Sequence, residues 1–394
     1  MDLKLDFPGI QTRLTDSEVD IICEGIKSAK SLSMGPNLKA FEDNFASFVG
    51  VENAFGVSSA TAALELAAIL CRVEEGDEVL LPAHTFAATA LPFIRRKAKI
   101  VFVDIDPETF VMDTNDLAKK VTNKSKVIVP VHLYGLPVKM DVVMDIASKN
   151  GLLVVEDCAQ APGAEYCGKK VGSWGDFGCF SFHGQKNITT LGEGGMLTTN
   201  STKYVEEILG LRKIGARPFL NQKKYWQPAM SNIIEAIPGE IPYNFAMGEI
   251  QALAGDLILK RIGKINEVRR NQAAQIIDAL SDFSELSFQK VPENCLSAYH
   301  LFPARYEGSN GKTRDDLIDL LFTKYGIKTV VQYYPLYKYE LFINNGCSGG
   351  NCPETDRFFD NMISFPFASD MDPKDIDYLI SSTKSAMKEL RGEA

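Results

Sequence analysis

The sequence predicts an α/β fold: a large domain with a mixed, mainly parallel sheet flanked by helices, followed by a smaller α+β domain. Short apolar runs alternate with helical windows through the first two-thirds of the chain. These runs are nearly continuous in hydrophobicity, as parallel strands covered on both faces are. After Gly239 the alternation gives way to a long helical pattern. We therefore expect a large domain over residues 1–250 and a small one over 251–394, with the N-terminal segment packing on the small domain.

Individual elements follow from local patterns. A helix over about 15–29 begins at a Thr/Asp start, and a second one, LKAFEDNFASFVG, follows the turn at Gly35-Pro36. Strands of the large sheet are expected at Ala54–Val57, Glu78–Leu81, Lys99–Val103, Lys126–Val131, Leu152–Glu156, Phe177–Phe182 and Gly195–Thr199, with helices such as Ala60–Cys71 and Met140–Lys149 between them. Further on we expect two helices over 245–280, strands at Leu301–Tyr306 and Lys328–Gln332, helices at Thr313–Tyr325 and Pro373–Leu390, and a surface loop over 344–353.

Composition narrows the class of protein. With 45% hydrophobic and 24% charged residues the chain reads as a soluble globular protein, and no apolar segment is long enough to cross a bilayer. The start has no apolar core behind a basic end, so we expect a cytoplasmic protein without a membrane partner. A net charge of −9 argues against a nucleic-acid partner. Cys347 and Cys352 are the only close cysteine pair, with no histidine beside them, so no metal site is expected.

One lysine, in a loop between two predicted strands, is a candidate amine nucleophile. Lys186 lies in a polar, Gly/Thr/Asn-rich segment between the strands expected at Phe177–Phe182 and Gly195–Thr199. A lysine amine attacks a carbonyl only when its setting lowers the amine pKa. The alternative is a solvated loop lysine. A reactive lysine is favoured over a solvated one only if other residues of a matching site occur elsewhere in the chain.

Residues just after the strands of an open α/β sheet meet at its ligand-binding edge. Ser58-Ser59-Ala60-Thr61 runs from the first strand straight into a helix, which makes an anion site suited to phosphate, or simply an N-cap. Phe86 follows the second strand and is either a ring that stacks on a planar ligand or a core residue. Asp157 ends the fifth strand after the apolar run LLVV. Such a carboxylate needs a cation, for which a protonated ring nitrogen or a structural salt bridge is suitable.

Ser181 and His183 flank the ligand side of the lysine segment, and the Ser181 hydroxyl adds to the expected phosphate site. A phosphate site, a stacking ring, a buried carboxylate and a lysine, in that order, are what a pyridoxal 5'-phosphate site needs. The lysine binds the cofactor aldehyde, while the carboxylate keeps the pyridine nitrogen protonated.

The chain resembles the sugar aminotransferases of the DegT/DnrJ/StrS family, pyridoxal-phosphate enzymes of the aspartate-aminotransferase fold type (fold type I). The resemblance runs from about residue 7 to the C-terminus and rests on these stretches in this order: GPNLKAFEDNFASFVG, VSSATAALELA, GDEVLLPAHTFAATA, VFVDIDPETF, VHLYGLPVKMD, VVEDCAQAPGAEYCGKKVGSWGD, FSFHGQKNITTLGEGGM and YNFAMGEIQA.

The resemblance implies a role for each cofactor-binding position. Lys186 is similar to the Schiff-base lysine, Asp157 to the partner of the pyridinium nitrogen and Gln160 to the residue that binds the ring hydroxyl. Ser59, Ala60 and Ser181 are similar to the residues that bind the cofactor phosphate, and Phe86 is similar to the aromatic residue that stacks on the ring. Asn244 is similar to the asparagine that reaches the phosphate from the neighbouring subunit. The Asn244 match implies a homodimer with shared active sites.

Several residues of the sequence, mainly those expected near the substrate, differ from the family motifs. The segment ITTLGEGG is one residue longer than the commoner form, and Ala60 replaces a more usual glycine. A later His-Tyr-x-Pro-x-His pattern appears as Gln332-Tyr333-Tyr334-Pro335-Leu336-Tyr337. A basic stretch over 208–226, with Arg212, Lys213, Arg217, Lys223 and Lys224, either receives an anionic substrate or is solvated. The residues expected to meet the substrate are His183, Lys223, Tyr225, His300 and Tyr337.

The function implied is transfer of an amino group from L-glutamate to a keto or aldehyde sugar, with pyridoxamine 5'-phosphate as the intermediate cofactor form. The acceptor is a nucleotide-linked ketosugar or an oxidised octulosonate that yields 8-amino-octulosonate, in polysaccharide or lipopolysaccharide biosynthesis. Two alternatives are a pyridoxamine-phosphate-dependent sugar dehydratase, a branch with histidine in place of Lys186, and a non-catalytic cofactor-binding regulator.

Overall fold

The computed structural model describes residues 3–218, 224 and 231–393. Its centre is a seven-stranded sheet in the order β1-β9-β8-β5-β4-β2-β3. Its strands are β1 (Asn53–Val57), β2 (Glu78–Pro82), β3 (Lys99–Val103), β4 (Ser125–Ile128), β5 (Leu153–Asp157), β8 (Phe177–Ser181) and β9 (Gly195–Thr199). Only the pairings of β9 with β1 and β8 are antiparallel. The predicted mixed, mainly parallel sheet is confirmed.

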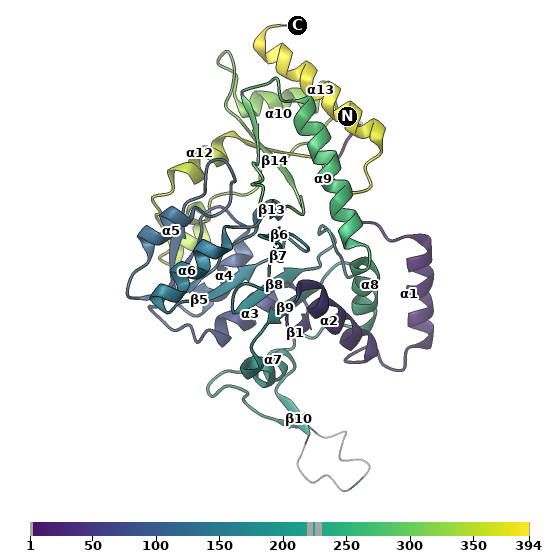
Figure 1. Ribbon diagram of the computed structural model, residues 1–394, viewed down its shortest axis with the longest axis vertical. Helices are drawn as coiled ribbons and strands as arrows, with labels where there is room; N and C mark the ends of the chain where they lie inside the picture. The colour runs from purple at the N-terminus through teal and green to yellow at the C-terminus, as the bar shows by residue number, and fades with distance from the viewer. Residues whose placement is uncertain (1–2, 219–223, 225–230, 394) are drawn as a thin grey trace.

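Helices cover both faces of this sheet (Figure 1). They are α2 (Pro36–Val49), α3 (Ala60–Leu70), α4 (Leu91–Arg95), α5 (Thr114–Lys120), α6 (Met140–Asn150) and α7 (Val205–Arg212), with the 3-10 turn η1 (Ala87–Thr89) before α4. Helix α1 (Asp16–Ser28) instead packs on α8 (Glu249–Leu259), at the right of Figure 1. Successive residues of β2 point into different cores: Val79 and Leu81 pack in the cluster that contains α3, and Leu80 packs in the cluster that contains α5 and α6. The strands are mainly apolar because both faces of the sheet are buried.

A second unit follows β9 and α7 in the chain. It holds the antiparallel sheet β12-β14-β15 and lies at the top of Figure 1, with α10 and α13. Its elements are β12 (Leu286–Phe288), β14 (Phe302–Tyr306), α10 (Arg314–Thr323), β15 (Met362–Phe365) and α13 (Pro373–Arg391). Between α10 and β15 the chain forms α11 (Glu340–Asn344) and α12 (Pro353–Asn361), whose Phe342 and Phe358 pack in the clusters of the large sheet. The N-terminal segment joins this unit: Leu5 lies in its hydrophobic cluster, and the amides of Lys4 and Leu5 donate to the Gly326 carbonyl.

The long helical pattern forms α8 (Glu249–Leu259) and α9 (Ile262–Ala279). The first turns of α9, with Ile262 and Ile265, pack in the cluster of α2 and β9, whereas Ala273 and Ile276 pack in the cluster of the C-terminal sheet. One helix therefore links both cores. Two small sheets complete the described fold: β13-β6-β7 and β10-β11. Their strands are β6 (Glu165–Tyr166), β7 (Lys169–Lys170), β13 (Cys295–Leu296), β10 (Ala216–Pro218) and β11 (Ser231–Ile233).

One local prediction is wrong. Residues 328–332 form no strand and reach the C-terminal sheet through a single bridge, Val330 to Ser364. The surface loop predicted over 344–353 is confirmed, because most of its residues are exposed and irregular, although Cys347 and Cys352 are buried and pack in the large-sheet core. In the described part of the chain, no helix combines the length and apolar character needed to span a membrane.

Candidate active site

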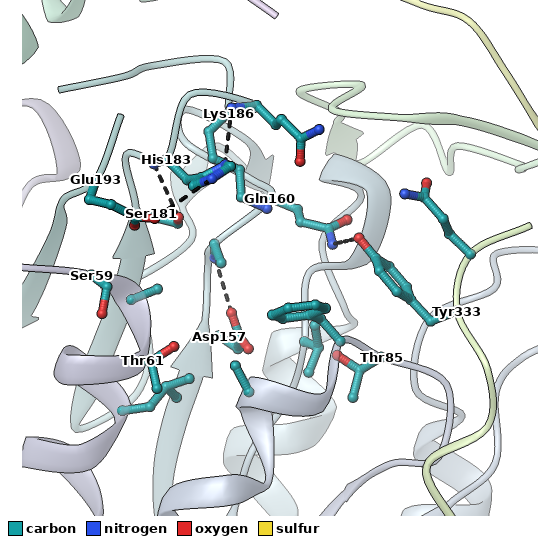
Figure 2. A pocket seen from close by; sticks show the side chains of 18 residues that line it. Ser59, Thr61, Thr85, Asp157, Gln160, Ser181, His183, Lys186, Glu193 and Tyr333 are labelled. Carbon is teal, nitrogen blue, oxygen red and sulfur yellow. Dashed lines mark hydrogen bonds and ion pairs between the residues drawn. The ribbon is translucent and has the colours of Figure 1, made fainter. Parts of the chain in front are cut away.

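A cavity of about 380 Å³ opens at the carboxyl ends of the strands of the large sheet. Residues that follow four strands line it: Ser59 after β1, Phe86 after β2, Asp157 at the end of β5 and Ser181 at the end of β8. Figure 2 shows Lys186 on the upper side of this cavity and Asp157 on the lower side. The parallel strands bring together residues that lie up to 122 positions apart, from Ser59 to Ser181.

One end of the cavity is an anion site. Ser59 is the N-cap of α3, and its hydroxyl accepts a hydrogen bond from the Ala62 amide at 3.1 Å. The amides of Ala60 and Thr61 belong to the first turn, where no earlier helical carbonyl exists to accept them. Gly195 lets β9 approach closely, because a Cβ there would lie 2.4 Å from the Ser59 carbonyl carbon. The site thus offers free amides, hydroxyls and the positive end of a helix dipole.

Asp157 is fixed from two sides. The Thr89 hydroxyl donates to Oδ2 at 2.8 Å, and the Ala159 amide donates to Oδ1 at 3.1 Å. Burial raises the pKa of Asp157, and these two hydrogen bonds together with the charge of Lys186 oppose that rise. The carboxylate is 5% exposed and faces a cavity rather than bulk water, so a cationic ring nitrogen beside it would be strongly favoured.

Lys186 is held on a tight turn, in which its amide donates to the His183 carbonyl at 2.8 Å. Burial lowers the pKa of the Lys186 amine to about 8, although the charge of Asp157 acts in the opposite direction. An appreciable fraction of the amine is therefore unprotonated near neutral pH, which nucleophilic attack requires.

Gln160 presents an N–H to the cavity. Its side-chain oxygen accepts from the Tyr134 amide at 2.7 Å, which fixes the orientation of the amide group. The Gln160 nitrogen donates to the Tyr333 hydroxyl at 3.0 Å. Phe86 is 56% exposed, and its ring meets the Tyr333 ring edge-on with centroids 5.8 Å apart. The exposed face of the Phe86 ring lines the cavity, so Phe86 is not a core residue.

These features fit pyridoxal 5'-phosphate group by group. The α3 terminus and Ser181 would hold the phosphate, Phe86 would cover the ring and Asp157 would face the ring nitrogen. Gln160 would donate to the ring hydroxyl, and Lys186 would bind the aldehyde. The cofactor then supplies an electron sink for proton removal at the carbon next to nitrogen.

The residues predicted to meet the substrate do not all gather here. His183 lines the cavity, with Nε2 3.7 Å from Glu193 Oε1. His300 lies behind the lysine, on a smaller cavity shared with Lys186. Tyr337 lies outside both: its hydroxyl donates to Asp356 at 2.8 Å and its ring packs on Phe102, so the predicted contact is not supported. The expected contacts of Lys223 and Tyr225 lie outside the described residues.

Asn244 is exposed and does not line this chain's cavity. Its backbone pairs with Lys213 in an isolated bridge. The Asn244 side chain is therefore not one of the groups that line the cavity of its own chain.

The basic stretch is partly structural. Arg212 ends α7, is 2% exposed, and forms an ion pair with Glu42 while donating to the Gly56 carbonyl. Arg217 binds the carbonyl and carboxylate of Glu206. Neither of the two interpretations left open for the stretch over 208–226 holds for Arg212, because its side chain is buried and its charge is already neutralised inside the protein.

Sequence reasoning missed several groups at the site. Thr89 and Thr85 form a buried hydroxyl pair, 3.0 Å apart, beneath Asp157. Tyr333 binds Gln160 and faces Phe86. Other lining residues that were not singled out are Gln185 and Glu193. Thr61, which also lines the cavity, belongs to the stretch predicted as an anion site, and the departure from the family pattern at Gln332-Tyr333 pointed to Tyr333.

Glu156, beside Asp157, is structural. Its two oxygens accept from the amides of Gly172, Trp174 and Gly175, each at 2.8 Å, and from His132 at 3.1 Å. With four donors the buried carboxylate is satisfied by the protein itself.

An α/β sheet with a lysine, an aspartate and a helix N-terminus meeting at its strand ends defines a pyridoxal-phosphate enzyme of the aspartate-aminotransferase fold type. The chain belongs to the DegT/DnrJ/EryC1/StrS aminotransferase family, which it matches over residues 14–384. This confirms the predicted family, fold class and enzyme class.

Three known proteins similar to this chain match between 84% and 98% of its length. The GDP-perosamine synthase of Caulobacter vibrioides is 34% identical over 84% of this chain and 86% of its own length. The UDP-N-acetyl-3-dehydro-alpha-D-glucosamine 3-aminotransferase of Acidithiobacillus ferrooxidans is 32% identical over 85% of each chain. Among solved structures, the putative sugar aminotransferase Spr1654 of Streptococcus pneumoniae in its PMP form matches with a TM-score of 0.89 at 28% identity, covering 98% of this chain and all of that one. Spr1654 has also been solved in its PLP form, in agreement with the predicted cofactor.

Proposed function

We propose that this enzyme transfers an amino group from L-glutamate to the keto carbon of a nucleotide-linked sugar, with pyridoxal 5'-phosphate bound to Lys186. The observation that carries the proposal is the arrangement of Lys186, Asp157 and the α3 terminus around one cavity. The lysine then serves as the base and acid that moves the proton between donor and cofactor. The products would enter cell-surface polysaccharide or lipopolysaccharide synthesis in the cytoplasm.

The nucleotide-linked class is favoured over an oxidised octulosonate by the relatives. The two curated relatives described above are named for GDP- and UDP-linked sugars. A panel of keto sugars tests this choice: the pyridoxamine form of the enzyme is mixed with each one, and return of the visible absorbance band identifies the acceptor. Turnover of an octulosonate aldehyde alone would overturn the nucleotide-linked assignment.

Lys186 separates the proposal from its alternatives. A dehydratase would have no need of a lysine amine, and a regulator would bind cofactor without turning over glutamate. L-Glutamate should convert the cofactor of the wild-type protein to its amine form, and Lys186→Ala should lose both this conversion and the visible band. An unchanged spectrum and unchanged turnover in Lys186→Ala would exclude the assignment.

We also propose a homodimer in which Asn244 reaches the phosphate of the neighbouring subunit. Its exposure on this chain supports that placement. Complementation gives the test: Lys186→Ala and Asn244→Ala are each expected to be defective as homodimers. A hybrid of the two has one site with both native residues if Asn244 acts across the interface. Absence of recovery in hybrids of proven composition would place Asn244 in its own subunit's site.

A further inference from the structure

The imidazole of His300 lies against the reactive lysine but does not line the large cavity. Its Nε2 is 3.5 Å from Lys186 Nζ. His300 is 3% exposed and lines the small cavity that also contains Gln11 and Lys186, but it is not part of the large cavity where cofactor and sugar would sit. A residue in that position acts on the lysine rather than on the substrate.

The tautomer of His300 follows from two backbone carbonyls. The Pro162 carbonyl accepts from Asn266 Nδ2 at 2.8 Å, so the oxygen of that amide faces Asn187. The Ala298 carbonyl accepts from Asn187 Nδ2 at 2.8 Å, and the same nitrogen donates to Asn266 Oδ1 at 3.0 Å. Both N–H groups of Asn187 are thereby used, and its oxygen is left facing His300 Nδ1 at 3.4 Å.

Because an amide oxygen only accepts, His300 Nδ1 must carry the proton of the neutral ring. Nε2 is then a bare lone pair directed at the Lys186 amine. The backbone of His300 is also fixed: Arg269 donates to its carbonyl at 2.8 Å, and the amide of His300 donates to the Tyr134 carbonyl at 2.8 Å. Gly135 permits that docking, since a Cβ there would lie 2.6 Å from the Tyr299 nitrogen.

The surroundings keep this ring neutral. Burial lowers the pKa of His300 well below its usual value, and the positive charges of Lys186, Arg269 and, when protonated, His183 lower it further. A neutral imidazole can accept a hydrogen bond from Lys186 in both of its states, as amine and as ammonium. His300 therefore does not have to gain or lose a proton when Lys186 does.

We propose that His300 is a catalytic partner of Lys186, whose bare Nε2 accepts one N–H of the lysine and so turns the nitrogen lone pair toward the cofactor side. When Lys186 takes up a proton, the ammonium donates that hydrogen bond to Nε2 and is stabilised within the dry site. The role rests on the proposed function only in that Lys186 is the reactive amine. The hydrogen bond itself is a property of the cofactor-free protein.

The first test measures the tautomer of His300 by NMR and does not depend on enzyme activity. The chain has four histidines, so ¹⁵N-labelled imidazoles of the cofactor-free protein give four spin systems, and His300→Phe assigns one of them by its loss. We expect His300 to be a neutral Nδ1–H tautomer throughout about pH 5 to 9, a range that brackets the usual histidine pKa. An imidazolium, or an Nε2–H tautomer, at pH 7 would overturn the proposal even if the enzyme proves to be an aminotransferase.

The second test follows Lys186 itself. Trinitrobenzenesulfonate modifies unprotonated amines, and mass spectrometry isolates the rate at Lys186 as a function of pH. His300→Phe should shift the midpoint to lower pH, because the ammonium loses its acceptor, and should slow cofactor attachment about tenfold or more at high pH. His300→Gln restores an acceptor oxygen, so it should recover most of the wild-type pH midpoint and most of the wild-type rate of cofactor attachment. His84→Phe removes another buried histidine that binds Tyr134 and should leave the midpoint unchanged. An unchanged midpoint in His300→Phe would contradict the proposal.

Discussion

The Thr89 hydroxyl donates a 2.8 Å hydrogen bond to Asp157 Oδ2, and that hydroxyl is itself 3.0 Å from the Thr85 hydroxyl. Thr89 ends η1, three residues after Phe86, so one short segment carries both the exposed ring and the group that orients the carboxylate. Asp157 is thus oriented by a neighbouring loop and not only by its own strand.

Replacing Thr89 with valine should weaken cofactor binding. A hydrogen bond to a charged group contributes about 1.5–3 kcal/mol, so we expect about a ten- to a hundred-fold rise in the dissociation constant. Thr89→Ser keeps the hydroxyl and should bind nearly as the wild type does. Titration of pyridoxamine 5'-phosphate into cofactor-free protein measures both. Equal loss in the two variants would indicate a packing effect of the methyl group instead.

Cofactor attachment should depend on pH through Lys186. Its amine pKa is lowered to about 8 by burial, so the unprotonated fraction rises about tenfold per pH unit below 8 and then levels off. Stopped-flow absorbance after mixing cofactor-free protein with pyridoxal 5'-phosphate measures the rate from about pH 6.5 to about pH 9.5. A rate that still climbs tenfold per unit above pH 9 would mean that the lysine keeps its ordinary pKa.

Gly195→Ala should damage the phosphate end of the site. The added Cβ would lie 2.4 Å from the Ser59 carbonyl carbon and 2.7 Å from the Ala60 nitrogen, both of them backbone atoms that cannot rotate away. Overpacking of this kind costs about 1–3 kcal/mol, and the shift of the α3 terminus should also reduce phosphate affinity. Gly263→Ala is the control, because a Cβ at that position in α9 meets open space. Calorimetric titration with pyridoxamine 5'-phosphate and the melting temperature report the two effects. Normal affinity in Gly195→Ala would show that the close approach of β9 is not required.

Glu42→Gln should destabilise the fold. Glu42 on α2 neutralises the buried Arg212, and removal of one member of a buried ion pair costs about 3–5 kcal/mol. Asp43→Asn, the next residue on α2, breaks only the exposed pair with Lys39 and should cost below about 1 kcal/mol. The midpoints of urea denaturation compare the two. Similar small losses would mean that Arg212 finds another partner when Glu42 is neutral.

The sheet was largely predictable because its strands are buried on both faces and read as continuous apolar runs. β3 and β9 occupy the predicted residues, and β1 and β8 differ by one residue at one end. The strand expected at residues 328–332 fails because an apolar run does not reveal whether a partner strand lies beside it. Here only Val330 meets Ser364.

Lys186, Asp157 and Ser59 could be found because each follows or ends a strand, where the fold class places ligands. Thr89, Tyr333 and the orientation of His300 could not. Thr89 points at Asp157 only because η1 turns the chain back beneath β5, and His300 meets Lys186 across 114 positions. The sequence left two interpretations of the basic stretch open because composition does not distinguish a buried, paired arginine such as Arg212 from a free one.

Helix α9 has a mechanical consequence. At 1.5 Å per residue its 18 residues span about 27 Å, and its two ends are embedded in different cores. A rigid-body closure of the C-terminal sheet over the cavity would have to bend this helix near its middle, where residues 266–272 contain neither proline nor glycine. His300 is also tied to that stretch through Arg269. The stretch of α9 between the two cores therefore lacks the residues at which helices usually bend, so α9 resists movement of the C-terminal sheet relative to the large sheet.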